Sequence, residues 1–191
     1  MKSQLLLAPN QLTLLRLVFI PWIVISVLYN HWWWALALFV AAGVSDGLDG
    51  FLARTLQQRS TLGEYLDPIA DKLLLSTLFV VLSFREKIAW KYTVLVFSRD
   101  VCILVICAVV FAATTLRDFR PSFFGKSNTC AEIGAIFFVL VYQVNQSGFV
   151  RFVRKGFLLA TMILTVLSAL HYVFLLGQRM TQQHVKGNVA R

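Results

Sequence analysis

The chain has 191 residues, of which 58% are hydrophobic and 14% charged, and its mean hydropathy is +0.72. This composition is far more apolar than that of a soluble domain. It therefore excludes a soluble protein and indicates a polytopic membrane protein. The formal net charge of +9 fits contact with anionic lipid headgroups. Nucleic acid is a poor partner, because the basic residues are scattered over loops with no soluble domain to present them.

Six apolar runs are close to the length of about 20 residues that a helix needs to span a bilayer. The predicted fold class is therefore all-α, a membrane helix bundle of about six transmembrane helices. Six helices leave no room for a second domain, so residues 1–191 are predicted to form a single membrane domain. The runs lie near residues 12–29, 32–52, 62–84, 92–114, 128–146 and 154–176.

The two ends of the chain are more polar than its middle. Residues 1–11 are predicted to be an interfacial segment, in which Pro9 and Asn10 are suited to begin a helix, with Asn10 as its cap. Arg16 then lies on a polar face, and two interpretations of it stay open: a side chain that extends to the membrane interface, and a part of a functional site. Residues 178–191 are polar and predicted to form a mobile tail.

Five of the nine acidic residues lie between positions 46 and 71. Residues three, four or seven apart share a helix face, so Asp46 and Asp49 form one stripe and Asp67 and Asp71 another. If the two helices are antiparallel neighbours, four carboxylates converge and repel one another unless cations or protons intervene. Hard oxygen ligands favour Mg²⁺ or Mn²⁺, so we predict a divalent metal site. The alternative is that these acids are solvated or are salt-bridged to Arg54, Arg59 and Lys72.

An aromatic turn, residues 29–34, separates the first two predicted helices, as expected at the headgroup layer. A helix that starts at Trp32 reaches Asp46 after about 21 Å, so the acidic site is predicted to be shallow and on the side opposite that turn. The side with the site carries ten Lys and Arg against six on the other. This difference favours a multi-pass protein of the cell membrane whose termini and active site face the cytoplasm.

The acidic stretch follows the pattern D-x2-D-G-x2-A-R-x8-G-x3-D-x3-D. All eight fixed positions are met, by Asp46, Asp49, Gly50, Ala53, Arg54, Gly63, Asp67 and Asp71. The pattern resembles the signature of CDP-alcohol phosphatidyltransferases. This resemblance implies a membrane enzyme of phospholipid biosynthesis that transfers a phosphatidyl group from CDP-diacylglycerol to an alcohol and releases CMP. It also implies a homodimer.

The same resemblance assigns roles to the residues of the acidic stretch. Two divalent ions would be held by the four aspartates, with Asp71 as a shared ligand or as the general base. Two glycines would let the cytidine lie against the helices, and an arginine would neutralise a phosphate. The residues assigned to CDP-diacylglycerol are Gly50, Ala53, Arg54, Thr61 and Gly63.

Charged residues in the later part of the chain are candidates for binding the acceptor alcohol. Arg99 and Asp100 lie within an apolar run, where charges are rare and usually functional. We expect Arg99 to face the active-site cavity, with Asp100 orienting it or pairing across the bundle. Lys126 stands at a helix start, where free N–H groups suit a phosphate, although an ordinary interfacial lysine is an equal alternative. The predicted acceptor-binding residues are Arg99, Lys126 and Arg120.

The acceptor is expected to be glycerol 3-phosphate, and phosphatidylglycerol and an inositol phosphate remain open. The family's frequent Arg-Glu appears here as Arg99-Asp100, and its Lys-x-Lys-Thr as Lys126-Ser-Asn128-Thr129. These departures are similar to cardiolipin synthases of the CDP-alcohol type, whose acceptor is phosphatidylglycerol. Two other classes are a divalent-cation transporter, which needs a path through the membrane, and a structural lipid-binding protein, which needs no ordered set of acids.

Overall fold

The computed structural model describes residues 8–55, 61–113 and 123–189, with side chains for 14–47, 69–103, 105 and 125–171. Within these ranges all regular structure is α-helical, with six helices and no strand. The predicted all-α fold class is confirmed, and the six described helices correspond to the six predicted apolar runs. The helices are α1 (Ala8–Leu28), α2 (Trp32–Thr55), α3 (Thr61–Phe84), α4 (Trp90–Ala113), α5 (Phe123–Val144) and α6 (Gly148–Val189).

Helices α1 and α3 end in the same way. Each is followed by a residue in the left-handed region of backbone conformation, Asn30 with φ 62° and Glu86 with φ 57°. The N–H of the next residue, His31 or Lys87, donates back across the turn to a helical carbonyl at 2.8 Å in both cases. This hydrogen bond belongs to a Schellman motif, which satisfies the last carbonyls of a helix and lets the chain reverse.

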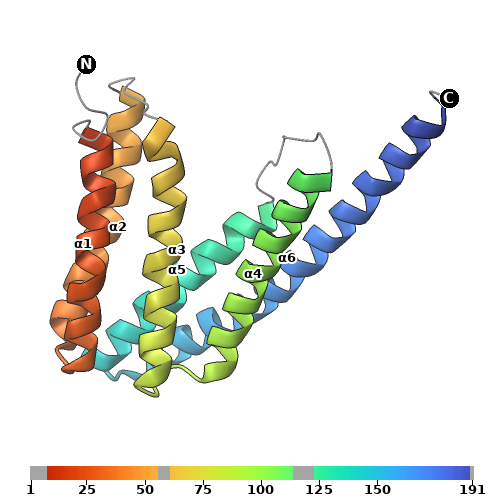
Figure 1. The fold of residues 1–191 in the computed structure, drawn as a ribbon. Helices are drawn as coiled ribbons and strands as arrows, with labels where there is room; N and C mark the ends of the chain where they lie inside the picture. Colours follow the sequence, from red (N-terminus) through yellow and green to blue (C-terminus); the bar gives the residue numbers. More distant parts are fainter. Residues whose placement is uncertain (1–7, 56–60, 114–122, 190–191) are drawn as a thin grey trace.

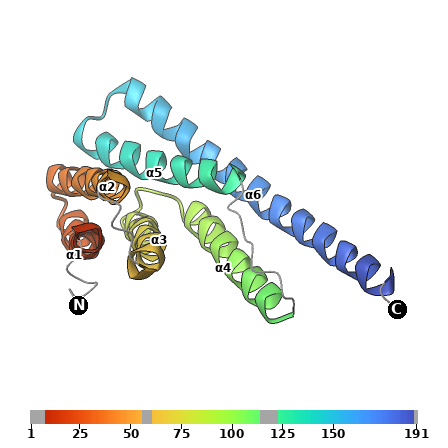
Figure 2. The ribbon, with the colours of Figure 1, turned by 90° about the horizontal axis from the view of Figure 1, so that it is seen from above.

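The helices run alternately up and down. The start of α1 and the end of α6 lie at one end of the bundle, and the turns after α1, α3 and α5 lie at the other (Figure 1). The side chain of Arg85 donates to Asn30 Oδ1 and so joins the first two of these turns. Seen from above, α1, α2 and α3 form one group, which we call the N-terminal group (Figure 2). Helices α5 and α6 lie side by side, with α4 against α6 and α3, and form the C-terminal group.

Apolar side chains are found both inside the bundle and on its surface. The hydrophobic core is formed by fully buried residues of four helices, among them Ile23, Val27, Ala35, Leu78, Phe79, Leu82, Ile136 and Leu140. Large apolar side chains also point outward, with Trp33 71%, Phe84 69% and Phe152 77% exposed. An outer surface of this kind suits lipid better than water.

Two of the described helical stretches, Gly125–Val144 and Gly148–His171, are long and apolar enough to cross a membrane. A shorter apolar stretch, Leu14–Leu28, lies in α1. Together with the apolar surface, they indicate a membrane protein. The count of six membrane spans stays a prediction.

The ends of the helices differ in part from the expected boundaries. α1 already begins at Ala8 and is continuous to Leu28, so the described residues show no separate interfacial helix before it. Pro9 lies in its first turn, where the missing N–H of proline costs no hydrogen bond. α6 has 42 residues and begins before the predicted run. It continues to Val189, so most of the predicted tail is helical, and its mobility stays a prediction.

Close packing of α5 on α6 depends on Gly134. A Cβ atom at this position would overlap the ring of Phe157, which is stacked on Phe138 with 5.1 Å between ring centroids. We expect Gly134→Ala to lower the free energy of unfolding by about 1–3 kcal/mol, the usual cost of overpacking. Thermal unfolding of the purified protein in detergent measures the effect.

Gly156→Ala is the matched control, because a Cβ at Gly156 meets nothing within 4 Å. Both substitutions gain the same helix propensity, so the difference between them isolates the overlap. Equal midpoints of unfolding for the two variants would contradict this account of the packing.

Candidate active site

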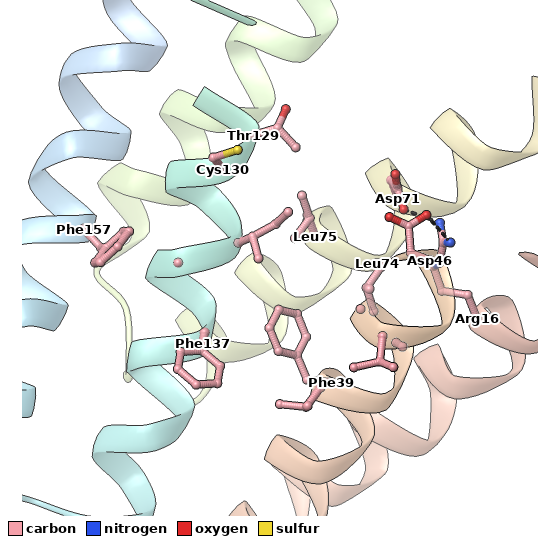
Figure 3. A pocket seen from close by; sticks show the side chains of 16 residues that line it. Arg16, Phe39, Asp46, Asp71, Leu74, Leu75, Thr129, Cys130, Phe137 and Phe157 are labelled. Carbon is pink, nitrogen blue, oxygen red and sulfur yellow. Dashed lines mark hydrogen bonds and ion pairs between the residues drawn. The ribbon is translucent and has the colours of Figure 1, made fainter. Parts of the chain in front are cut away.

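Asp46 of α2 and Asp71 of α3 converge on one side chain of α1, Arg16. The Arg16 Nη2 donates to Asp46 Oδ1, and its Nη1 donates to Asp71 Oδ1 (Figure 3). The guanidinium is buried, with 1% of the side chain exposed, whereas Asp46 and Asp71 are 48% and 43% exposed. The contact favours the second of the two interpretations of Arg16 left open by the sequence, a part of the predicted acidic site, and its role there stays a prediction.

Among the described side chains, the counter-ion of these two acids is Arg16, which was not weighed for that role on the sequence. Of the three that were, Lys72 pairs with Asp100 of α4, and Arg54 and Arg59 lie outside the described side chains. Instead, Arg16 ties together three helices that are far apart in the chain. A buried guanidinium in an apolar bundle is costly unless it is paired, and two carboxylates supply that pairing.

The remaining members of the predicted acidic site lie outside the described side chains. Only the backbone of Asp49 and Asp67 is described; it is helical, in α2 and α3, so the spacing that places each on the stripe of Asp46 or Asp71 is kept. Among the described side chains, no group of three or more His, Cys, Asp or Glu is gathered around one point. The side chains of the predicted CDP-diacylglycerol residues also lie outside them: Gly50, Ala53, Arg54, Thr61 and Gly63.

The carboxylates nevertheless fit a divalent cation. Asp46 and Asp71 both bind the guanidinium of Arg16, so their carboxylates approach each other from two different helices. Carboxylate oxygens are the donors that Mg²⁺ and Mn²⁺ prefer. The half-exposed state of both side chains leaves them accessible to an ion.

An apolar cavity begins at these carboxylates and runs between α2, α3 and α5. Its volume is about 490 Å³. Figure 3 shows Arg16, Asp46 and Asp71 at one end and Phe137 and Phe157 toward the other. The wall between them is apolar and is formed by Phe39, Val40, Leu74, Leu75, Ile133 and Gly134. A cavity with one charged end and an apolar length suits an amphiphilic molecule.

A second polar cluster lies between α3 and the C-terminal group, and its centre is Asp100 of α4. Lys72 Nζ lies 2.8 Å from both carboxylate oxygens of Asp100. Arg99 Nη1 donates to Asp100 Oδ1 at 2.6 Å, and Arg99 Nη2 donates to Ser168 Oγ of α6 at 2.9 Å. Asp100 therefore contacts Arg99 and also pairs across the bundle with Lys72, the two roles that the sequence suggested for it. The expectation that Arg99 faces the active-site cavity stays a prediction.

Glu132 of α5 completes the second polar cluster. It is buried, with 1% of its side chain exposed, and its Oε1 accepts a hydrogen bond from Asn128 Nδ2 at 2.6 Å. Thr165 Oγ1 of α6 donates to Asn128 Oδ1 at 2.9 Å. Glu132 Oε2 lies 4.0 Å from Lys72 Nζ and has no hydrogen-bond partner among the described residues.

The model of the CDP-alcohol phosphatidyltransferase family matches residues 6–172. The chain belongs to the CDP-alcohol phosphatidyltransferase family. The resemblance drawn from eight spaced residues is thus confirmed over most of the chain.

The relatives of this chain have names of two kinds. A CDP-diacylglycerol--glycerol-3-phosphate 3-phosphatidyltransferase of Aquifex aeolicus is 30% identical over 168 residues, 86% of this chain and 92% of the relative. A probable phosphatidylglycerophosphate synthase of Mycobacterium tuberculosis is 32% identical over 86% of this chain and 78% of the relative. The cardiolipin synthase (CMP-forming) of Homo sapiens is 34% identical over 141 residues, 65% of this chain. This chain spans about half the length of that human relative, 47%.

The predicted acceptor residues lie in different surroundings in this family member. Arg99 is buried and engaged in the second polar cluster, whereas Lys126 is exposed near the start of α5. Arg120 lies outside the described residues. A role of these three in binding an acceptor stays a prediction.

Sequence reasoning missed Lys72, Glu132 and Ser168 as partners in the second polar cluster. For Lys72 and Glu132 the available signal was a charge inside an apolar run, the same signal that singled out Arg99. Ser168 carries no such signal, because serine is common in membrane helices and only its place opposite Arg99 makes it a partner.

Loss of the Arg16 charge is expected to destabilise the N-terminal group. Arg16→Met keeps much of the side-chain volume but leaves the carboxylates of Asp46 and Asp71 to repel each other. Removing one partner of a fully buried ion pair costs about 3–5 kcal/mol, and we expect a smaller loss because the two acids are half-exposed. Thermal unfolding in detergent gives the measurement.

Arg16→Lys keeps the charge and serves as the control, with a smaller loss than Arg16→Met. Adding Asp46→Asn and Asp71→Asn to Arg16→Met removes the repulsion and is expected to recover part of the lost stability. If Arg16→Met unfolds at the wild-type temperature, the ion pairs contribute nothing.

Proposed function

We propose that this chain is an integral membrane enzyme of phospholipid biosynthesis. It transfers the phosphatidyl group of CDP-diacylglycerol to an alcohol and releases CMP. The observation that carries this proposal is the convergence of Asp46 and Asp71 at the charged mouth of an apolar cavity. The substrate of such a reaction has the same two parts, a charged diphosphate and apolar chains. Membership of the family and the names of its relatives support the same reaction.

The four aspartates would hold two divalent ions, Mg²⁺ or Mn²⁺. When bound, these ions neutralise the diphosphate and favour departure of CMP. Asp46, Asp49 and Asp67 serve as ligands, and Asp71 serves as a shared ligand or takes the proton of the acceptor hydroxyl. The acceptor oxygen then bonds to the phosphatidyl phosphorus while the bond to the CMP oxygen breaks. Arg16 holds Asp46 and Asp71 toward the same point before the ions arrive.

The apolar cavity between α2, α3 and α5 would hold an acyl chain of CDP-diacylglycerol. Its walls are aliphatic and aromatic, and its charged end coincides with the carboxylates that face the diphosphate. The nucleotide would then lie at the ends of α2 and α3, beside Gly50, Ala53, Arg54, Thr61 and Gly63. Burial of methylene groups supplies affinity, since each contributes about 0.8 kcal/mol.

Glycerol 3-phosphate is the acceptor that we propose first, and phosphatidylglycerol is the alternative. The names of relatives support both, a glycerol-3-phosphate phosphatidyltransferase and a cardiolipin synthase. Arg99, Lys126 and Arg120 would meet the phosphate of glycerol 3-phosphate, which carries about two negative charges and needs cationic partners. Phosphatidylglycerol carries one charge and would be held mainly by its apolar chains.

The proposed setting is a cell membrane crossed six times by one domain over residues 1–191, with the active site toward the cytoplasm. The excess of Lys and Arg on the side with the acidic site supports this orientation. The alternation of helices in Figure 1 supports the assignment of loops to the two sides, because successive helices run in opposite directions. A homodimer is proposed from the family resemblance.

Replacement of the site carboxylates by amides tests the reaction. We expect Asp46→Asn and Asp71→Asn each to lower the kcat for CMP release at least 100-fold, the usual effect of losing one preorganised charge. Release of labelled CMP from CDP-diacylglycerol by purified protein gives the measurement, with Mg²⁺ or Mn²⁺ supplied and then chelated. The matched control is Glu86→Gln, an exposed carboxylate in the turn after α3, one of the turns at the opposite end of the bundle.

Near-normal turnover by both Asp variants would contradict the proposed chemistry. Full activity after chelation would contradict the requirement for a metal while leaving the transfer reaction itself in place.

A panel of acceptors separates the two proposed substrates. We expect Arg99→Ala and Lys126→Ala to raise the KM for glycerol 3-phosphate at least tenfold, about 1.4 kcal/mol, with little change for CDP-diacylglycerol. Lys155→Ala, an exposed lysine in the first turns of α6, is the control. Wild-type protein that ignores glycerol 3-phosphate and converts phosphatidylglycerol would replace the first acceptor with the second.

A further inference from the structure

Lys72 follows Asp71 directly, yet it belongs to the second polar cluster. Its ammonium group lies 2.8 Å from both carboxylate oxygens of Asp100 on α4 and 4.0 Å from Glu132 Oε2 on α5. Asp71 contacts Arg16 of α1 and shares it with Asp46 of α2. Two consecutive residues of α3 are therefore held by ion pairs to helices of the two different groups.

The anions that face Lys72 are themselves held in place. Asp100 accepts from Arg99, and Arg99 donates to Ser168 of α6. Glu132 accepts from Asn128, which in turn accepts from Thr165 of α6. Each carboxylate is thus connected to α6 through one intervening side chain. Lys72 is therefore paired with anions that are fixed to the helices of the C-terminal group.

Small rotations of α3 would displace the carboxylate of Asp71 at the acidic site. Successive residues of a helix are separated by about 100°, so the direction of Lys72 fixes that of Asp71. A rotation of α3 by about 20° moves a carboxylate that lies about 6 Å from the helix axis by about 2 Å. Ligand distances at a metal site are tolerant to only about 0.2 Å. An ion pair that prevents such a rotation has a large effect on the site.

We propose that Lys72 is a positioning residue for Asp71: its ion pair with Asp100 fixes the rotation of α3, so that Asp71 faces Asp46 and a shared cation. This inference rests on the proposed function, because it assigns Asp71 to the metal-holding set. Lys72 acts through the helix and not on the substrate, since its ammonium is directed to Asp100 and Glu132.

The test compares Lys72→Met, Lys72→Arg and Asp100→Asn in the full-length protein in detergent. The first measurement needs no substrate: the Mn²⁺ concentration that gives half of the maximal thermal stabilisation. We expect this concentration to rise at least tenfold in Lys72→Met and Asp100→Asn, and to stay within threefold of wild type in Lys72→Arg. The second measurement is CMP release, in which kcat should fall at least tenfold in Lys72→Met while the KM for the acceptor changes less than twofold. Lys155→Met is the control for loss of a lysine charge.

Other results would overturn the proposal. A higher KM for the acceptor with unchanged Mn²⁺ dependence would make Lys72 a ligand of the acceptor phosphate. A lower unfolding temperature with unchanged Mn²⁺ dependence would show that the ion pair only stabilises the fold. If Mn²⁺ does not stabilise the wild-type protein, the site does not bind this cation and the proposal fails. If Lys72→Met does not fold, Asp100→Asn tests the same ion pair. If the wild-type protein binds Mn²⁺ but releases no CMP, the proposed function is refuted. The Mn²⁺ concentrations measured for the Lys72 variants would still decide whether Lys72 positions Asp71.

Discussion

The buried guanidinium of Arg16 is the constraint on which the N-terminal half of the bundle depends. Apolar packing alone has little preference for one rotation of a helix over another, because most faces of these helices are apolar. A buried charge has a strong preference, since leaving it unpaired costs several kcal/mol. Asp46 and Asp71 meet this requirement from two helices, so α1, α2 and α3 have one arrangement in which all three charges are paired. The same arrangement brings the two carboxylates together.

In the second polar cluster, on the other side of α3, charges are likewise paired with one another. Lys72, Arg99, Asp100 and Glu132 carry two positive and two negative formal charges, so the cluster is balanced within itself. Hydrogen bonds to Ser168 and Asn128 fill much of the remaining donor and acceptor capacity. α3 therefore lies between two ionic clusters and carries one residue of each at adjacent positions.

Much of this fold could be predicted from the sequence, because apolar length and turn residues are local signals. Six runs gave six helices, and the spacing of the aspartates placed Asp46 and Asp71 on facing stripes. Partners could not be predicted in the same way. Arg16 and Asp71 are separated by 55 positions and Lys72 and Asp100 by 28, so their pairing is a property of helix packing. The extent of α6 was also missed, since its last turns are polar and lie beyond the apolar run.

The exposure of the three charges in the first cluster indicates how an ion and a lipid can approach them. Arg16 is buried behind Asp46 and Asp71, whereas both carboxylates are nearly half-exposed and also line the apolar cavity. In the proposed function, an approaching cation would therefore meet the carboxylates first, with the arginine still in the core of the N-terminal group. The proposed acyl chain would lie in the same cavity between α2, α3 and α5, with its headgroup at the carboxylates. The substrate that this arrangement favours is one whose charge and apolar chain are joined, as they are in a nucleotide-activated lipid.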